Sequence, residues 1–300
     1  MFSEFKTFVA VAREGTFTGA GRTLGLTQSA VSAQMKRLEA FIGTPLFERG
    51  AKSAVLNAHG RDVLEQARAV ITQVDGMRAV HHPGGVTGTL RIGAIASVQQ
   101  HALVRAMLAF QRTYAAVKLR VVPGVSLALL GQVDAGELDL AVMIRPPFAL
   151  PPELLWQPVF AEPMALAVPH GYQGGDWRRA LNEMPFIRYE RASFGGRTVD
   201  QFLRKQKIAV KEFIELDEVD AMVNMVRAGL GVALIPVSEQ LDRTDIQLID
   251  LTPHDVSREI GIVLRAPVSP DSLAGAMTRC FLETSGDVSV GTHRSSAIPA

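Results

Sequence analysis

A short segment near the start of the chain carries side chains suited to reading the edges of DNA bases. Projected as a helix with about 100° per residue, Ser29, Ser32 and Lys36 share one arc about 60° wide. Gln28 stands at the start of the same segment, where a recognition helix meets base edges. Hydroxyl and amide groups reach those edges, and a lysine neutralises phosphate. The alternative is a solvated helix whose serines and alanines only confer solubility.

No comparable set of residues points to catalysis. The single cysteine, Cys280, excludes an intrachain disulfide and a cysteine-based zinc site. The chain has no GxGxxG, P-loop, HExxH or GxSxG motif. His81 and His82 lack further ligands and are interpreted as a solvated linker. The acid pair Asp217 and Glu218 is interpreted as charge at a helix start. We therefore expect neither an enzyme nor a bound metal or cofactor.

Length and charge indicate a two-domain protein with a basic head. The chain has 300 residues, which suggests two domains, and a net charge of +1. Residues 1–58 carry 7 bases and 4 acids, whereas residues 59–300 carry 24 bases and 26 acids. A basic end is expected where a protein meets a polyanion. No apolar run approaches the roughly 18 residues of a membrane span, and early charges interrupt any signal peptide. We expect a cytoplasmic protein with no membrane partner.

The base-reading segment is expected to lie in a helix-turn-helix. An apolar stripe predicts a first helix over residues 2–13: Phe5, Phe8, Val9 and Ala12. Thr18 is expected to cap a second helix over residues 19–24, and Thr27 a third over residues 28–42. The third helix has an apolar arc that can pack on the other two: Val31, Met35, Leu38 and Ile42. Short helices joined by a tight turn at Gly25 match a helix-turn-helix.

A basic wing is predicted after this helix. Leu46 and Phe47 can anchor a hairpin on the core, with Arg49 and Lys52 at its tip near the phosphate backbone. The alternative is a basic loop in solvent.

The next segment, residues 58–80, predicts one long helix that mediates dimerisation. Apolar residues repeat along it at the spacing of a heptad seam: Val63, Ala67, Val70, Val74 and Met77. The alternative is that this stripe packs on the chain's own body. Residues 81–85 then form a hinge.

The remaining sequence alternates strands with helices, which predicts a parallel sheet with crossover helices. A first pass has strands over residues 90–95, 117–122 and 138–143. A second has strands over residues 185–187, 213–216 and 232–235, with a helix over residues 219–227 between the last two. Residues 164–168 and 260–265 are expected to carry the chain across and back. Ala135-Gly136 and Ala228-Gly229 each precede the last strand of a pass, which suggests two similar lobes with a ligand cleft between them.

The segment from Ala20 to Gly60 resembles the head of LysR-type transcriptional regulators. The matching residues form a long run with unbroken spacing: Ala20-Gly21, Leu24, Thr27–Ser32, Gln34–Glu39, Gly43, Leu46-Phe47, Arg49, Leu56 and Gly60. Gly21, Ser29 and Asn57 depart from the family's usual Ala, Pro and Thr. Gly21 lowers helix propensity, whereas Asn57 still caps the following helix. The later segment resembles the effector-binding domain of the same family.

The resemblance implies an α/β protein with an N-terminal all-α winged helix-turn-helix and a two-lobed effector domain like periplasmic binding proteins. The head spans residues 1–58 and the linker helix and hinge residues 59–85. The effector domain, here called the body, spans residues 86–284. Its lobe I covers about 86–162 and 264–284, and its lobe II about 163–263. Residues 285–300 are expected to form a disordered tail.

These matches imply a ligand-responsive DNA-binding regulator. The expected partners are double-stranded DNA, a small-molecule effector and a second copy of the chain, as homodimer or homotetramer, with RNA polymerase a further candidate. Arg22, Arg49 and Lys52 would hold phosphates, and the groove would face Thr27, Gln28, Ser29, Ser32 and Lys36. A solute-binding receptor is the alternative, but it leaves the head unexplained and needs an export signal.

The effector is expected to be a small organic anion in the cleft. Ser97, with Gln100 in capping-box spacing, and Ser126 stand where strand ends meet helix starts, and free N–H groups there attract anions. Arg145 or Arg191 could fork a carboxylate, and Phe194, on a mobile segment, could form an apolar wall. The alternative is that both serines are only helix caps and both arginines lie in solvent.

Overall fold

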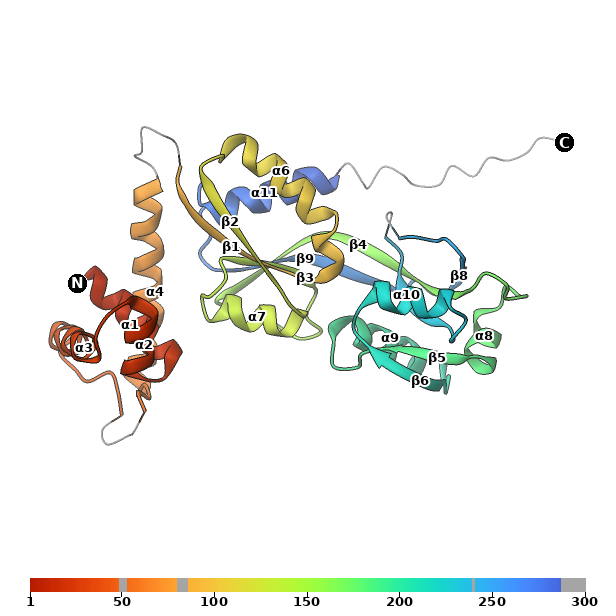
Figure 1. Cartoon of the computed structure of the whole chain (residues 1–300), viewed down its shortest axis with the longest axis horizontal. Coiled ribbons are helices and arrows are strands. Elements are labelled where there is room, and N and C mark those ends of the chain that lie inside the picture. Colours follow the sequence, from red (N-terminus) through yellow and green to blue (C-terminus); the bar gives the residue numbers. More distant parts are fainter. Residues whose placement is uncertain (49–52, 80–85, 239–240, 287–300) are drawn as a thin grey trace. The chain divides into compact units, whose positions relative to one another are not determined.

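The computed structural model describes residues 1–48, 53–79, 86–238 and 241–286, apart from the side chains of residues 72, 73, 75–79 and 286. The chain divides after Thr87 into two compact units. Figure 1 shows the elements of each unit, which are described separately below. No helix in these described ranges is both long and apolar enough to cross a membrane.

The first unit begins with three helices, α1 (Phe2–Glu14), α2 (Phe17–Leu24) and α3 (Gln28–Ile42). The expectation that Thr18 caps the second helix is wrong. Thr16 is the N-cap, because its backbone is extended and its hydroxyl accepts the Gly19 N–H at 3.0 Å. Thr27 caps α3 as predicted, with its hydroxyl accepting from Ala30 at 3.2 Å.

These helices enclose the core of the head. The predicted apolar arc of α3 faces inward, with Val31, Met35 and Leu38 at most 2% exposed. In α1 Phe8 of the predicted stripe is fully buried together with Val11, whereas Phe5 and Val9 of that stripe are only partly buried. Leu46 is fully buried, and Phe47 packs edge-on against Phe8 with ring centroids 5.8 Å apart.

The predicted hairpin is present at its base. Phe47 pairs with Leu56 in an antiparallel bridge, and the Glu48 N–H donates to the Val55 carbonyl at 2.8 Å. Leu46 and Phe47 therefore anchor a wing on the core, as expected. Its tip, with Arg49 and Lys52, lies outside the described residues.

The long helix α4 (Ala58–Ala79) follows, and Asn57 caps it by accepting the Gly60 N–H at 2.7 Å. The predicted dimer seam needs correction at its first two positions. Val63 and Ala67 are 6% and 1% exposed because they belong to the head core. Val70 is 37% exposed and Val74 is half-buried. The unfilled part of the apolar stripe, which the head core does not cover, therefore starts at Val70. The side chain of Met77 lies outside the described residues.

Lobe I of the second unit contains β1 (Gly88–Ala94), β2 (Val117–Pro123) and β3 (Leu140–Ile144), with β1 parallel to both others. Its helices are α5 (Ala96–Gln99), α6 (Ala102–Thr113), α7 (Ser126–Asp134) and α11 (Leu273–Gly286). In Figure 1, α6 and α11 lie together on one face of the sheet and α7 covers the other.

Two long antiparallel strands, β4 (Leu154–Pro169) and β9 (Ser257–Arg265), connect the lobes. β4 pairs with β9 from Leu154 to Pro163 and then changes partners. From Met164 onward it pairs with β7 (Ala233–Pro236) and β8 (Ile246–Asp250) of lobe II. Residues 164–168 and 260–265 belong to the two connecting strands, as predicted, but both strands are longer than expected. Residues 164–168 already pair with lobe II, and residues 260–264 pair with β3 of lobe I.

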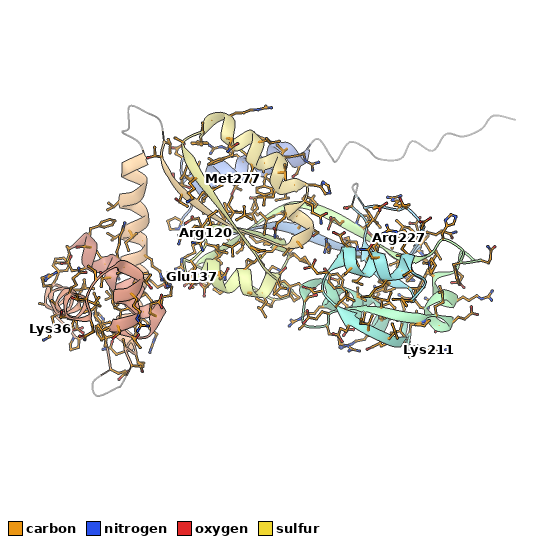
Figure 2. The ribbon with its side chains drawn as sticks, in the orientation of Figure 1. Lys36, Arg120, Glu137, Lys211, Arg227 and Met277 are labelled. Carbon is orange, nitrogen blue, oxygen red and sulfur yellow. The ribbon has the colours of Figure 1, made fainter. Side chains whose placement is uncertain are left out.

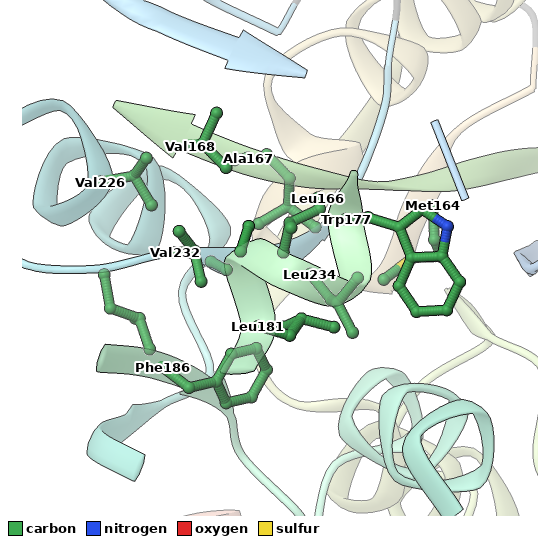
Figure 3. Close-up of a cluster of buried hydrophobic side chains, with 14 of the residues drawn as sticks. Met164, Leu166, Ala167, Val168, Trp177, Leu181, Phe186, Val226, Val232 and Leu234 are labelled. Carbon is green, nitrogen blue, oxygen red and sulfur yellow. The ribbon is translucent and has the colours of Figure 1, made fainter. Parts of the chain in front are cut away.

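Lobe II adds β5 (Pro185–Tyr189), β6 (Lys211–Leu216), α8 (Trp177–Glu183), α9 (Phe194–Gln206) and α10 (Val219–Arg227). Its core gathers side chains from α8, β5 and β7, among them Leu181, Phe186 and Leu234 (Figure 3). The β5–β6 pair is parallel, as the alternation of strands and helices predicts.

The two Ala-Gly pairs predicted from the sequence mark equivalent helix ends in the two lobes. Gly136 and Gly229 follow α7 and α10 with φ of 69° and 78°, a left-handed conformation that glycine adopts without strain. Their N–H groups donate to Val133 and Val226, both at 2.9 Å. The predicted tail starts too early, because α11 continues through Gly286; residues 287–300 lie outside the described part.

Candidate DNA-binding and effector-binding sites

The polar arc of α3 is exposed. Gln28, Ser29 and Lys36 are exposed and Ser32 is half-buried, with Lys36 on the outer side of the helix (Figure 2). Thr27 and Ser29 share a hydrogen bond of 3.0 Å at the helix start. Within the described residues, Gln28 and Lys36 make no side-chain hydrogen bond or ion pair. Both side chains are therefore available to a ligand such as DNA.

The cations of the head divide into paired and unpaired groups. Arg13 binds Glu14 at 2.7 Å, and Arg37 binds the buried Glu4 at 3.0 Å. The N-terminal amine is the main cause that lowers the pKa of Glu4 to about 2, and Arg37 contributes. Arg22 and Lys36, by contrast, have no carboxylate partner among the described residues. A cation left without an acid can neutralise phosphate without first breaking an ion pair.

The structure explains why position 21 is a glycine, which the sequence alone does not. A Cβ at this position would lie 2.7 Å from the Leu26 carbonyl oxygen, and the Leu26 N–H donates to the Gly21 carbonyl at 2.8 Å. The lower helix propensity of glycine is thus offset by a close turn between α2 and α3. This turn sets the direction in which α3 leaves the core.

A cavity of about 290 Å³ lies between the lobes of the body. Lobe I supplies the ends of its strands and the starts of α5 and α7, including Ser97 and Ser126. Lobe II supplies Tyr189, Ser193 and the start of α10, and the connecting strand β9 supplies Arg258. The cleft outside the strand ends is therefore the site that the alternating pattern predicts.

Arg258 organises this cavity, and sequence reasoning missed it. The side chain is 2% exposed and donates to Glu162 at 2.6 Å, to the Tyr189 hydroxyl at 3.0 Å and to the Ser97 hydroxyl at 2.9 Å. One guanidinium, carried by β9, thus contacts both lobes and the other connecting strand, β4. The only sequence signal is a charged pair, Arg258-Glu259, directly before the apolar run that starts at Ile260.

Both predicted serines line the cavity, but neither acts as a helix cap. Ile95 is the N-cap of α5, so Ser97 lies inside that helix and accepts from Arg258 instead. Val125 is the N-cap of α7, and the Ser126 hydroxyl accepts the Ile144 N–H at 3.3 Å. The capping-box interpretation of Ser97 and Gln100 is therefore wrong, and so is the alternative that both serines are only caps.

The two arginines expected to bind a carboxylate do not line the cavity. Arg145 is 61% exposed in its side chain and binds Glu259 at 3.0 Å. Arg191 binds Glu215 at 3.1 Å and also Glu212. Each guanidinium is thus neutralised by an acid outside the cavity, and their assignment to an effector is corrected.

Phe194 is also absent from the lining. Its ring is 2% exposed and meets the Phe148 ring edge-on, with centroids 5.7 Å apart. The expected mobile segment is wrong, because Gly195 and Gly196 are buried in the first turn of α9. Phe148 precedes β4 in lobe I, so this contact links the lobes beside the cavity.

Three carboxyl groups face the cavity from lobe II. Glu218 is the N-cap residue of α10, with Asp217 before it and Asp220 in the first turn. The predicted pair Asp217 and Glu218 does stand at a helix start, because α10 begins at Val219, but all three carboxyl groups also line the cavity. Burial raises the pKa of Asp217 above its ordinary value, and Glu190 and Glu218 add to the rise. Asp220 accepts from the Gln100 amide at 2.6 Å, which is another contact between lobes.

Head and body together define a DNA-binding domain joined to a small-molecule-binding domain. Residues 2–61 match the family model of the bacterial regulatory helix-turn-helix protein, lysR family, and residues 83–286 match the LysR substrate binding domain. The chain belongs to the LysR family of transcriptional regulators. Its named relatives are regulators, so the chain is a regulator rather than an enzyme.

Individual proteins agree with this assignment. The chain is 27% identical over 282 residues to the HTH-type transcriptional regulator IlvR of Caulobacter vibrioides, covering 91% of this chain and 95% of the relative. A full-length OxyR variant from Pseudomonas aeruginosa has a similar fold, with a TM-score of 0.69, 20% identity and coverage of 100% and 99% of the two chains. The effector binding domain of QuiR, solved in complex with shikimate, has a TM-score of 0.60 and 15% identity over 67% of this chain and 98% of that one.

Proposed function

We propose that this regulator reads its operator through α3 and that a small effector in the interlobe cavity changes its affinity for DNA. The cavity carries the proposal, because its lining comes from both lobes and includes the Arg258 network that spans them. A ligand that binds one arrangement of the lobes more tightly than another shifts the population toward it. The QuiR domain, of similar fold, was solved with a small molecule, which supports a ligand site in this fold.

The charge of the effector is a separate question. The starts of α7, α9 and α10 contribute residues to the lining, and helix starts attract negative groups. This favours the organic anion expected from the sequence. The loss of Arg145 and Arg191 from the cavity and the presence of three carboxyl groups oppose it.

DNA binding is tested with an operator selected from random duplexes. We predict that Gln28→Ala lowers discrimination between the operator and random DNA by about 1–3 kcal/mol, as expected for one lost base contact. Arg22→Ala should weaken binding to both DNAs alike and lower the salt slope by about one unit. Fluorescence anisotropy at several salt concentrations measures both effects.

A matched control is Arg13→Ala, because Arg13 is already paired with Glu14. It should leave affinity and salt slope nearly unchanged. Equal weakening of operator and random DNA by Gln28→Ala would show that Gln28 does not read bases.

A further inference from the structure

The part of the cavity formed by the turn after β6 and the start of α10 is acidic. Asp217, Glu218 and Asp220 line it, and Arg258 is the one cation in the described lining. Arg258 is already neutralised, because its Nε donates to Glu162 at 2.6 Å and both residues are buried. A cavity with this balance of charge attracts a cation and repels a simple anion.

None of the three carboxyl groups forms an ion pair within the described residues, although the charge of Arg258 acts on Asp217 from across the cavity. Glu218 makes no side-chain cap bond, and Asp220 accepts from the neutral amide of Gln100. Asp217 meets the Ser193 hydroxyl and stands near Glu190 and Glu218. The helix dipole accounts for Asp220, which lies in the first turn of α10. It does not account for Asp217, which precedes the N-cap and is half-buried among like charges.

Another part of the lining offers hydrogen-bond donors. The Ser126 and Tyr189 residues are 5% and 3% exposed, and each hydroxyl accepts one bond, from Ile144 at 3.3 Å and from Arg258 at 3.0 Å. Neither hydroxyl donates its own proton to an acceptor in the described part of the chain. Ser97 likewise accepts from Arg258. Because a hydroxyl both donates and accepts, these buried protons are free for an acceptor on a ligand.

We infer that the effector is a small zwitterion of the amino-acid type. Its protonated amine is received by Asp217, Glu218 and Asp220, and its carboxylate by the hydroxyls of Ser97, Ser126 and Tyr189. The inference rests on the proposed function, since it names the ligand class of the same cavity. The volume of about 290 Å³ is close to the lower limit of small-molecule sites, roughly 300 Å³, and suits a ligand of this size.

Two probe sets test the class of ligand on the full-length chain. One set is the twenty standard L-amino acids, and the other is the matching α-hydroxy acids, in which a hydroxyl replaces the amine. Thermal shift screens both sets, and calorimetry then measures affinity. We expect at least one amino acid to bind and its hydroxy acid to bind at least tenfold more weakly, because the hydroxy acid keeps the carboxylate and loses the cation.

A pair of variants locates the amine. Asp217→Asn keeps the shape of the side chain and removes its charge, so the affinity for the amino acid should fall at least tenfold. Glu215→Gln is the control, since Glu215 lies two residues earlier, pairs with Arg191 and does not line the cavity. It should leave affinity unchanged. Thermal melts without ligand confirm that both variants fold.

Each outcome bears on one of the two proposals. Binding of the hydroxy acid as tightly as the amino acid, or binding of none of the twenty amino acids, overturns the zwitterion assignment. Operator affinity with and without ligand tests the proposed function. If hydroxy acids alone bind and change operator affinity, the proposed function stands and the zwitterion assignment fails. If an amino acid binds and operator affinity stays constant, the assignment stands and the response to effector fails.

Discussion

Asp217 is a residue whose ionisation opposes folding. Burial raises its pKa above the ordinary value, and Glu190 and Glu218 raise it further. The folded state therefore holds this proton more tightly than the unfolded chain, and stability falls as pH rises from the unfolded pKa near 3.9 through the folded one. We predict that Asp217→Asn raises the melting temperature at neutral pH.

The pH dependence of this gain is the sharper measurement. Melts of wild type and Asp217→Asn should differ least below the unfolded pKa near 3.9, where the carboxyl is protonated in both states, and the difference should grow as pH rises toward neutrality. A gain of constant size across this range would mean that charge is not its cause. A gain in stability with a loss of ligand affinity would mark Asp217 as a residue kept for binding.

Single residues differ in how far sequence could predict them. The groove-facing residues of α3 could be predicted, because helical periodicity fixes the direction of a side chain once the apolar arc is known. Arg258 could not, because its burial depends on Glu162 and Tyr189, which lie 96 and 69 positions away. Arg145 and Arg191 follow strands as expected, but nearby acids, unseen as partners in the sequence, turn them away from the cavity.

At the scale of elements, the start of α9 depends on a close approach between backbones. A Cβ on Gly196 would lie 1.8 Å from the Glu190 carbonyl oxygen. We predict that Gly196→Ala destabilises the body by about 1–3 kcal/mol, because the helix start must shift. Denaturant unfolding followed by circular dichroism measures the change.

Gly131 provides the matched control in α7. A Cβ there would meet nothing within 4 Å, so Gly131→Ala should stabilise the body by up to about 1 kcal/mol through helix propensity. Equal effects of the two substitutions would contradict the role assigned to the close approach at Gly196.

Elements with a strong apolar period could be predicted closely, and the others could not. The sequence predicts a helix over residues 219–227, and α10 has these bounds. The short helix α8 escapes prediction because its apolar stripe of Trp177, Ala180 and Leu181 spans less than two turns, too short a period to distinguish a helix, and the core of lobe II explains the burial of these residues. The strand β8 likewise depends on pairing with β4, which is distant in sequence.

At the scale of the whole molecule, substitutions at two positions on α4 are expected to affect folding and assembly separately. Val63 is 6% exposed in the head core, whereas Val70 is 37% exposed. We predict that Val70→Asp leaves the head folded and lowers the oligomeric state, because it places a charge in the unfilled stripe. Val63→Asp should instead unfold the head, since an unpaired buried charge costs several kcal/mol.

Sedimentation and circular dichroism together distinguish these effects. A wild-type chain that sediments as a folded monomer at micromolar concentration would rule out dimerisation through this part of α4. So would a Val70→Asp variant with the mass of the wild-type assembly.

Val63 and Ala67 pack into the head core, so the head and the start of α4 move as one rigid body. From Ala67 to the end of α4 at Ala79 the helix extends about 18 Å, at about 1.5 Å per residue. Over that length a tilt of about 10° moves the far end by about 3 Å. The same tilt turns α3 by the same angle, because α3 and α4 share one core. Any contact that tilts the far end of α4 therefore reorients the base-reading side chains of α3 without touching them.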